Sequence, residues 1–443
     1  MRRSHPSPAV GSAFRRTTLA VAAAMVCLGG GRMSAQGPAM PRVTFADAVQ
    51  RAIARNPSAA VAAAQILRAD ALVRQARAAT LLAVTGSVSS TTVGTTVKFE
   101  DTTVTPRTQV TASLDVAMPL YAPAAWARKA QAADEKDVAT LGAAETRRQI
   151  AVAAALAYLE VVANHRLVEG NERARAAAKA HYDFAHTQLE AGRGSLLNEL
   201  RAQQELSSTE VLLEAVRLAL YRSQEALGVV LAADGPMDTL GEPVFEVPAD
   251  IGIDEPTGLV LARTDLRLFS AQEQAADRVV RDSFKDRLPV VQGVFTPQAT
   301  YPSQFFLPSK SWRAVLFLSV PVFDSGLRAG FKQERQASLD AARADSAGAL
   351  MQARAEVRAA RESIRSAERA VASARAAAEQ AGRVLEIVTI SFKAGASTNL
   401  EVIDAERRAR DSDNAAAFAE DVLRRAKLDL LNALGRFPGD PQP

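Results

Sequence analysis

The stretch SFKAGASTNLEVIDAERRARD, at residues 391–411, lies inside a long helical pattern and interrupts it. Gly395 suits the left-handed backbone position that ends a helix, because glycine has no Cβ to clash there. Thr398 and Glu401 follow at the spacing of a T-x-x-E capping box, which satisfies free N–H groups at the start of the next helix. The stretch therefore predicts the tip of a helical hairpin.

A second stretch of the same kind, QLEAGRGSLLNELRAQQ, occupies residues 188–204. Its Gly192 precedes Gly395 by 203 positions, and Pro119, near the end of a strand-like segment, precedes Pro321 by 202 positions. Two landmarks with almost the same offset indicate an internal repeat. We therefore expect two copies of one structural unit, each with its own hairpin tip.

Each copy has the same internal order of patterns. Modest helices come first, at about 44–80 and about 255–286, and two strand-like segments follow. In residues 110–118 apolar side chains alternate with Thr, Ser and Asp, which predicts a strand with one apolar and one polar face. The helices on both sides of the glycine breaks carry apolar residues every seven positions and many Ala, which predicts a left-handed supercoil. The first long helix, about 124–191, should be roughly 100 Å long.

The first 35 residues predict a secretory signal peptide. They combine basic residues, the apolar run LAVAAAMVCL at 19–28 and a small-residue cleavage site. The alternative is a lipoprotein signal, in which Cys27 would be acylated and would anchor the chain. Residues 1–36 hold five Arg and no acid, so without them 48 basic residues face 49 acidic ones. This near-neutral remainder has no further cysteine and supports neither nucleic-acid binding nor disulfides.

We expect four parts along the chain, separated by changes in composition. The segment between the two repeats is rich in Gly, Pro and Asp, which indicates an irregular linker. The parts are a signal peptide at 1–35, a first structural repeat at 36–233 with two strands within about 82–120 and a hairpin tip near 192, the linker at 234–258, and a second structural repeat at 259–443 with two strands within about 288–323 and a tip near 395.

Motifs for catalysis and metal binding find little support in the sequence. Beyond the signal peptide the histidines are His165, His181 and His186. His181 and His186 are five positions apart, which is roughly 140° around a helix, so both cannot readily face one metal ion. No nucleophile elbow, phosphate-binding glycine loop or cysteine cluster is present. We expect no catalytic residues, no cofactor and no metal site, and we expect these histidines at the surface or in the supercoil seam.

The combination of these patterns resembles the TolC-like outer-membrane efflux protein (outer membrane factor) family over about residues 43–436. The resemblance implies an α+β fold that is internally duplicated. Long coiled-coil helices would form a periplasmic α-barrel, and a homotrimer would build one twelve-stranded outer-membrane β-barrel from four strands of each chain. The motifs that carry the resemblance are FKAGASTNLEVIDAERR, its echo LEAGRGSLLNELRAQQ, the strand exits MPLYAP and VPVFDSG, and the helix opener VTFADAVQRAIARNP.

The function implied by the resemblance is an exit channel for a tripartite efflux pump or a type I secretion system. The chain would lie in the outer membrane of a Gram-negative bacterium with a large periplasmic portion. It would dock on a periplasmic adaptor (membrane fusion) protein and serve an inner-membrane transporter of the RND, ABC or MFS class. The alternative is a periplasmic coiled-coil scaffold or adaptor without a pore. The sequence does not indicate whether drugs, metal ions, solvents or proteins are exported.

Two acids after the second tip are the candidate pore residues. The resemblance implies that Glu401 and Asp404, which share a helix face, line the periplasmic entrance and form its constriction. Glu401 stands where the family has Asp. This difference affects the width of the ring of carboxylates that a trimer would form at the entrance. The alternative is a solvated acidic face in which Glu401 is mainly a cap. The first repeat has Asn198 and Arg201 at the equivalent positions, so we expect Arg201 to pair with an acid of a neighbouring hairpin in the closed state.

The resemblance also assigns roles to the tips and to the aromatic residues. Tyr301, Phe305, Phe306 and Trp312 would lie near the outer face of the barrel, and Tyr121, Trp126 and Phe323 would mark its periplasmic interface, as aromatic girdles do. The alternative is ordinary packing in a soluble hairpin. The residues expected to contact the adaptor are Gly192, Arg193, Gly194, Ser195, Phe392, Gly395, Ser397 and Thr398.

Overall fold

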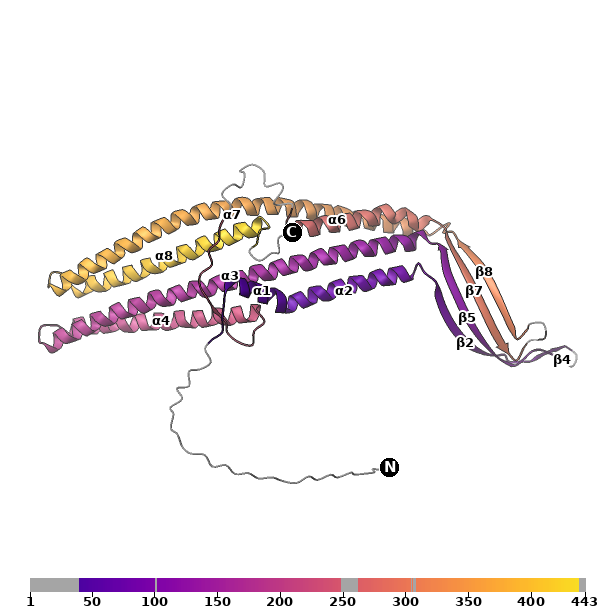
Figure 1. The fold of residues 1–443 in the computed structure, drawn as a ribbon, viewed down its shortest axis with the longest axis horizontal. Coiled ribbons are helices and arrows are strands. Elements are labelled where there is room, and N and C mark those ends of the chain that lie inside the picture. The colour runs from indigo at the N-terminus through magenta and orange to yellow at the C-terminus, as the bar shows by residue number, and fades with distance from the viewer. Residues whose placement is uncertain (1–39, 100–101, 248–261, 304, 306–307, 438–443) are drawn as a thin grey trace, which may run out of the picture. The chain divides into compact units, whose positions relative to one another are not determined.

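The computed structural model describes residues 40–99, 102–247, 262–303, 305 and 308–437. The predicted signal peptide with Cys27, residues 248–258 of the predicted linker, and Phe306 lie outside these ranges. Residues 40–443 form one compact unit. Within it the sheet lies at one end of the long helices and the two hairpin tips lie at the other end (Figure 1).

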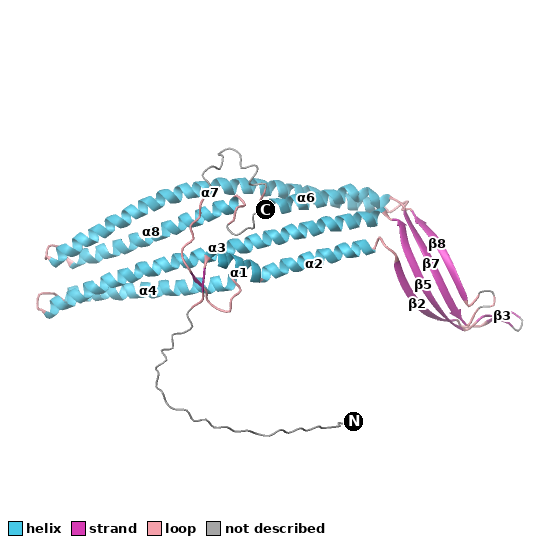
Figure 2. Cartoon of the chain, viewed as in Figure 1, coloured by secondary structure: helices cyan, strands magenta, loops and turns pink. Residues whose placement is uncertain are grey.

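The two halves of the chain have the same order of elements. Helices precede two strands in each half, and a helical hairpin follows the strands (Figure 2). The first half contains α1 (Phe45–Arg55), α2 (Pro57–Ala78), β2 (Ala83–Thr92), β5 (Thr108–Tyr121), α3 (Pro123–Glu190) and α4 (Leu196–Val230). The second contains α6 (Thr264–Asp282), the 3-10 helix η1 (Ser283–Arg287), β7 (Val290–Tyr301), β8 (Lys310–Ser319), α7 (Leu327–Lys393) and α8 (Asn399–Ala433).

Local sequence rules account for several of the element boundaries. Pro57 and Pro123 occupy the first turn of α2 and α3, where a missing N–H costs nothing. Asn56 caps α2, because its Oδ1 accepts a hydrogen bond from Ser58 N at 2.9 Å. β8 ends at Ser319, shortly before Pro321, which has no N–H to donate to a neighbouring strand.

The four longer strands form one antiparallel sheet in the order β2-β5-β7-β8. Among the described residues the outer edges of β2 and β8 have no strand partner. Two short pairs lie outside this sheet, β1 (Arg42–Val43) with β6 (Asp238–Thr239), and β3 (Val97–Phe99) with β4 (Thr102–Thr105).

The sheet has one mainly apolar and one mainly polar face, because side chains alternate along each strand. The register places Val84 beside Val116 and Phe295 beside Ala314 on the apolar face. The apolar face also carries exposed Val88, Leu114, Met118, Trp312 and Leu316. On the polar face hydrogen bonds cross from strand to strand, between Ser87 and Ser113 (2.7 Å), Thr111 and Thr300 (3.3 Å), Thr296 and Asp115 (2.7 Å), and Gln298 and Ser311 (3.1 Å).

The hydrophobic core lies in the middle of the long helices. Tyr158 on α3 is almost fully buried, and its ring meets Phe45 edge-on at 5.5 Å between ring centroids. The Tyr158 hydroxyl donates to the backbone oxygens of Leu240 (3.0 Å) and Gly241 (2.9 Å). Apolar residues of α1, α3, α4 and α8 complete this core, including Val49, Leu159, Leu227, Leu428 and Leu431.

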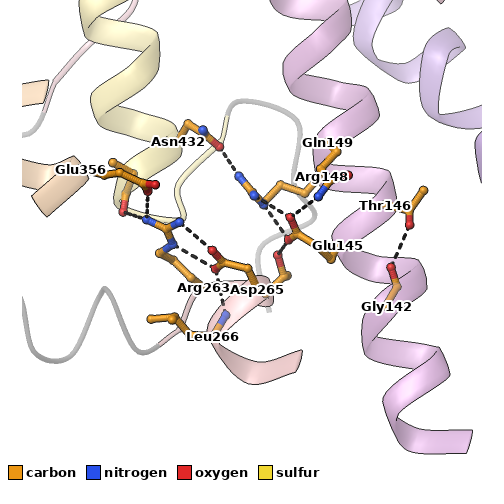
Figure 3. Close-up of polar contacts among 12 residues, drawn as sticks. Gly142, Glu145, Thr146, Arg148, Gln149, Arg263, Asp265, Leu266, Glu356 and Asn432 are labelled. Carbon is orange, nitrogen blue, oxygen red and sulfur yellow. Dashed lines mark hydrogen bonds and ion pairs between the residues drawn. The ribbon is translucent and has the colours of Figure 1, made fainter. Parts of the chain in front are cut away.

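A buried charged cluster joins α3, α6, α7 and α8 close to this core (Figure 3). Arg263 is 6% exposed, and its guanidinium donates to Asp265 (2.7 and 3.0 Å), to Glu356 (2.8 Å) and to the carbonyl oxygen of Ala433 (3.2 Å). These bonds hold the start of α6 against α7 and the end of α8, all within the second repeat. Because every partner lies on a different part of the chain, this guanidinium fixes their relative positions.

A second guanidinium continues this cluster on α3. Arg148 binds Glu145 through two nitrogens (2.6 and 2.8 Å) and donates to Asn432 of α8. Thr264, next to Arg263, donates to the same Glu145 at 2.7 Å and so links the two guanidinium groups. We call this set the base network: Glu145, Arg148, Arg263, Thr264, Asp265, Glu356 and Asn432.

Candidate functional site at the hairpin tips

The two hairpin tips are built from the same backbone device. Gly192 has φ 73° and Gly395 has φ 79°, which is the left-handed conformation that glycine adopts without strain. Ser195 then caps α4, where its hydroxyl accepts a hydrogen bond from Asn198 N at 3.3 Å. The first tip also needs Gly194, because a Cβ there would lie 2.8 Å from the backbone nitrogen of Leu189.

The second tip contains the predicted capping box. The Thr398 hydroxyl accepts from Glu401 N at 3.4 Å, and the Glu401 carboxylate accepts from Thr398 N at 2.9 Å. The prediction made from the T-x-x-E spacing is therefore confirmed. One oxygen of the Glu401 carboxylate therefore caps the start of α8, while the side chain remains exposed.

The three candidate pore residues are exposed, but a single chain does not bring them together. Asp404 forms an ion pair with Arg408 at 2.9 Å, one turn further along α8. Arg201 on α4 makes no hydrogen bond or ion pair with Glu401 or Asp404 in the part of the chain that the structure describes. A partner for Arg201 among these acids would have to come from another copy of the chain.

The predicted docking residues divide into outward and inward ones. Gly192, Arg193, Ser195, Gly395 and Thr398 are exposed. Phe392 instead turns inward, where its ring meets those of His181 (5.6 Å between centroids) and Phe184 (5.7 Å). Ser397 is partly covered and donates its hydroxyl hydrogen to the carbonyl oxygen of Val388 at 3.0 Å.

The sequence prediction missed a group of exposed apolar side chains beside the tips. Leu196, Leu197 and Leu200 at the start of α4 are between 52% and 58% exposed, and Leu400 at the start of α8 is 59% exposed. An apolar cluster directly after a cap, as in the sequence LLNEL, was the signal that could have identified them. Such exposed groups on a helix end are typical of an interaction surface.

Near the tips the two hairpins are held together at a buried histidine. His181 on α3 lies 2.6 Å from Asn399 Oδ1 through its Nε2 and 3.3 Å from Glu406 Oε2 through its Nδ1. Asn399 in turn donates to the carbonyl oxygen of Asn198 at 3.2 Å, which ties the start of α8 to the start of α4. The histidine thus acts as a contact between repeats, which its position in one helix could not reveal.

A buried carboxylate on α4 makes a second contact between the hairpins. Glu205 is 3% exposed and accepts from Arg407 of α8 at 2.7 Å (Nε) and 2.5 Å (Nη2). Arg410 lies 3.6 Å from the other oxygen of the same carboxylate. We call His181, Glu205, Asn399, Glu406 and Arg407 the tip joint.

The charges of the tip joint shift the pKa of His181. Burial by itself lowers this pKa, but the hydrogen bond and the negative charge of Glu406 outweigh it, and Asn399 and Glu205 add to their effect. The net result is a raised pKa, so the protonated ring is favoured in the folded chain. A cavity of about 180 Å³ lies directly beside this ring, between Phe184, Leu385, Phe392 and Val402.

The aromatic residues assigned to a membrane interface lie at the ends of the sheet. Tyr121 ends β5 and meets Trp126 at the start of α3, with 5.7 Å between ring centroids. Trp312 on β8 is 71% exposed and Phe323 is 85% exposed. The Trp312 ring keeps one ring contact, with Phe295 at 5.9 Å between centroids, while most of its surface stays open.

The described residues were also searched for metal sites and membrane helices. Within them, no group of three or more His, Cys, Asp or Glu is placed to hold a metal ion. Only α3 of the described helices is long and apolar enough to cross a membrane, and half of its apolar stretch is buried inside the unit. That burial is typical of a core helix, whereas the apolar face of the sheet carries large side chains that stay exposed.

Comparisons with known proteins agree on one family and one fold. The profile of the family described as Outer membrane efflux protein matches residues 48–233 and 260–436. The chain is 25% identical over 272 residues to outer membrane protein OprJ of Pseudomonas aeruginosa, a match that covers 61% of this chain and 54% of that protein. The chain thus spans about half the length of the curated relatives it matches.

Solved structures extend the likeness to nearly the whole chain. The outer membrane protein VceC from Vibrio cholerae has a TM-score of 0.76 at 19% identity, with 88% of this chain and 96% of that chain covered. The CmeC outer membrane channel of Campylobacter jejuni has a TM-score of 0.78 at 15% identity, with 90% and 87% covered. At these identities the likeness concerns the fold.

Proposed function

The chain belongs to the outer membrane efflux protein family, and on this basis we propose that it forms the outer-membrane exit channel of a tripartite efflux pump or a type I secretion system. The observation that carries the proposal is the four-stranded sheet, which has an exposed apolar face, a hydrogen-bonded polar face and two unpaired edges. In a bilayer the apolar face suits lipid and the polar face suits a water-filled lumen.

The open edges favour a homotrimer. Unpaired strand edges are not tolerated in lipid, so β2 and β8 must pair with another copy of the chain. Three chains would close one twelve-stranded barrel. Their long helices would continue it as a periplasmic tunnel, with the repeats at 36–233 and 259–443 alternating around the wall and residues 1–35 directing export.

The exposed tips support docking on a periplasmic adaptor protein. Leu196, Leu197, Leu200 and Leu400 add apolar surface to the predicted tip residues around Gly192 and Gly395. An inner-membrane transporter would act below the adaptor and select the substrate, so the channel itself needs neither catalytic residues nor a cofactor. Tyr121, Trp126, Trp312 and Phe323 would sit at the two lipid–water interfaces.

The acids after the second tip would form the periplasmic entrance. In a trimer Glu401 and Asp404 of each chain would face the same axis and favour cations. Arg201 would then pair with an acid of an adjacent hairpin in the closed state. Arg201→Ala should raise the closed conductance in planar bilayers, whereas exposed Arg193→Ala, at the outer tip, serves as control; an unchanged closed conductance would refute the pairing.

The test of the channel proposal is extraction and conductance. The full chain should need detergent for release, should migrate as a heat-modifiable trimer, and should conduct ions in planar bilayers. A periplasmic scaffold without a pore would be released without detergent and would give no conductance. Glu401→Gln with Asp404→Asn should lower the cation preference of the closed channel, because it removes the proposed ring of carboxylates.

A further inference from the structure

The strands of the sheet carry very few charged residues. Along β2, β5, β7 and β8 the charged side chains are Asp115, Lys310 and Arg313. Lys310 is the first residue of β8 and belongs to the apolar face, where its register partner is Ala299. Asp115 and Arg313 both belong to the polar face, well inside their strands.

These two charged residues lie in the same row across the sheet. Thr85 of β2 pairs with Asp115, and Thr296 of β7 pairs with Arg313. Thr296 also donates its hydroxyl hydrogen to Asp115 Oδ1 at 2.7 Å, which connects the two halves of the row. Two strand spacings, about 10 Å, therefore separate the acid from the base.

The row has a physical consequence inside a membrane. Ionised groups at mid-height of a lipid-spanning sheet are stable only where they face water, so the polar face must line an aqueous lumen. A separation of about 10 Å equals the Debye length at 0.1 M salt, so ions passing the wall experience each charge separately. The Thr296 bond holds the Asp115 carboxylate at its place, while Arg313 is exposed and extends from the wall.

We propose that Asp115 and Arg313 form a mixed-charge belt inside the barrel that balances the preference of the pore for small cations and anions. The proposal rests on the channel function above and adds a second charge filter, separate from the acids at the tips. In a closed barrel of three chains the acids and bases alternate around one level of the lumen. Loss of either Asp115 or Arg313 leaves the opposite charge of the belt uncompensated.

The test is the reversal potential of the reconstituted full chain under a KCl gradient centred near 0.1 M, where the Debye length is about the separation of the two charges. Asp115→Asn should shift the potassium-to-chloride permeability ratio toward chloride, and Arg313→Gln should shift it toward potassium, each by about twofold. The double variant should return close to the unmodified channel. Lys310→Gln, which removes a charge from the apolar face of β8, should change nothing.

The measurements are repeated in the Glu401→Gln/Asp404→Asn background, so that the tip acids cannot mask the belt. Opposite shifts in both backgrounds support the belt. A channel that conducts but keeps its permeability ratio in both single variants overturns the belt and leaves the channel function standing. Absence of conductance from heat-modifiable trimers overturns both. Trimer formation by each variant shows that the sheet has folded.

Discussion

Two of the places where the repeats touch, the base network and the tip joint, have very different chemistry. In the base network, permanently charged guanidinium groups meet several oxygens each, and Arg263 is 6% exposed. In the tip joint, one contact depends on a titratable ring, His181, which borders a cavity of about 180 Å³. The base is therefore held by permanently charged groups, while the tip depends in part on a titratable ring that borders a cavity.

This difference assigns separate roles to the two ends of the hairpins. Breaking a buried ion pair strands an unpaired charge, which costs several kcal/mol. Local opening draws on regions with few buried apolar contacts. The tips can thus separate while the base keeps the repeats in register, and four measurements would break or sharpen that distinction.

The largest effect is expected in the base network. Arg263→Ala leaves Asp265 and Glu356 without their shared cation and should lower the free energy of unfolding by about 3–5 kcal/mol. Thermal unfolding of the detergent-solubilised protein, followed by circular dichroism, measures the loss. Arg267→Ala, an exposed position on the same helix, is the control. If both variants lost the same free energy of unfolding, the base network would not be what holds the helices together.

A smaller and more local effect is expected at the tip joint. Glu205→Gln removes the charge that Arg407 and Arg410 share and should cost about 2 kcal/mol. Hydrogen exchange should rise in the tip halves of α4 and α8 and stay unchanged around Tyr158. Glu210→Gln, on the same helix as Glu205, breaks an exposed pair with Arg175 of α3 and should have little effect. Exchange that rises along the whole of α8 would contradict a separate tip.

The third measurement separates the two regions by pH. The raised pKa of His181 means that its bond to Glu406 contributes full stability below the ordinary histidine pKa of about 6.5 and loses it as pH rises through the folded value. Hydrogen bonds from Arg263 and Arg148 outweigh burial and lower the pKa of Asp265 and Glu145, so the base network weakens only in acid. Between roughly pH 6 and 8 only the tip should loosen.

Hydrogen exchange of peptides from the tips, measured over this pH range and corrected for intrinsic exchange rates, reports the loss of stability at the tip. His181→Gln should reduce the pH dependence at the tip, and the remainder should come from His186, whose pKa is raised by its hydrogen bond to Glu199 at 2.6 Å. His165→Gln, which removes the ring that lies 2.6 Å from Asp238 in the middle of α3, should leave it intact. A tip that loosens equally with pH in His181→Gln would assign the effect to other groups.

The smallest effect concerns the helix caps. Thr398→Ala and Ser195→Ala each remove one hydroxyl acceptor and should each cost about 1 kcal/mol, seen as fraying of the first turn of α8 or α4. Similar costs would show that the tips are alike in their backbone and differ only in charge. If Ser195→Ala caused no fraying of α4, Gly192 and Gly194 alone would define the first tip.

The hairpin tips could be predicted from the sequence by local rules, whereas the contacts between the repeats could not. The left-handed Gly395 and the Thr398–Glu401 box depend on residues within one turn, so spacing alone predicts them. Alternation along residues 110–118 likewise predicts the faces of β5. His181 was expected at the surface or in the seam without its partners, since Asn399 lies 218 positions away.

The base network was missed for the same physical reason. Arg148 meets Asn432 across 284 positions, and Arg263 meets Glu356 across 93. A guanidinium in an Arg-rich helical sequence gives no sign of which carboxylate it will find, because many alternatives have equal spacing. The belt of Asp115 and Arg313 also required the strand register, which alternation does not supply.

The matched lengths of the hairpin arms restrict how this chain can change over evolution. The outgoing helices α3 and α7 have 68 and 67 residues, and the return helices α4 and α8 have 35 each. An insertion of seven residues keeps the supercoil seam but lengthens one arm by about 10.5 Å. In one hairpin alone it would carry that tip past the other and separate His181 from Asn399. Relatives with longer or shorter tunnels should therefore differ by whole heptads added or lost in all four arms together.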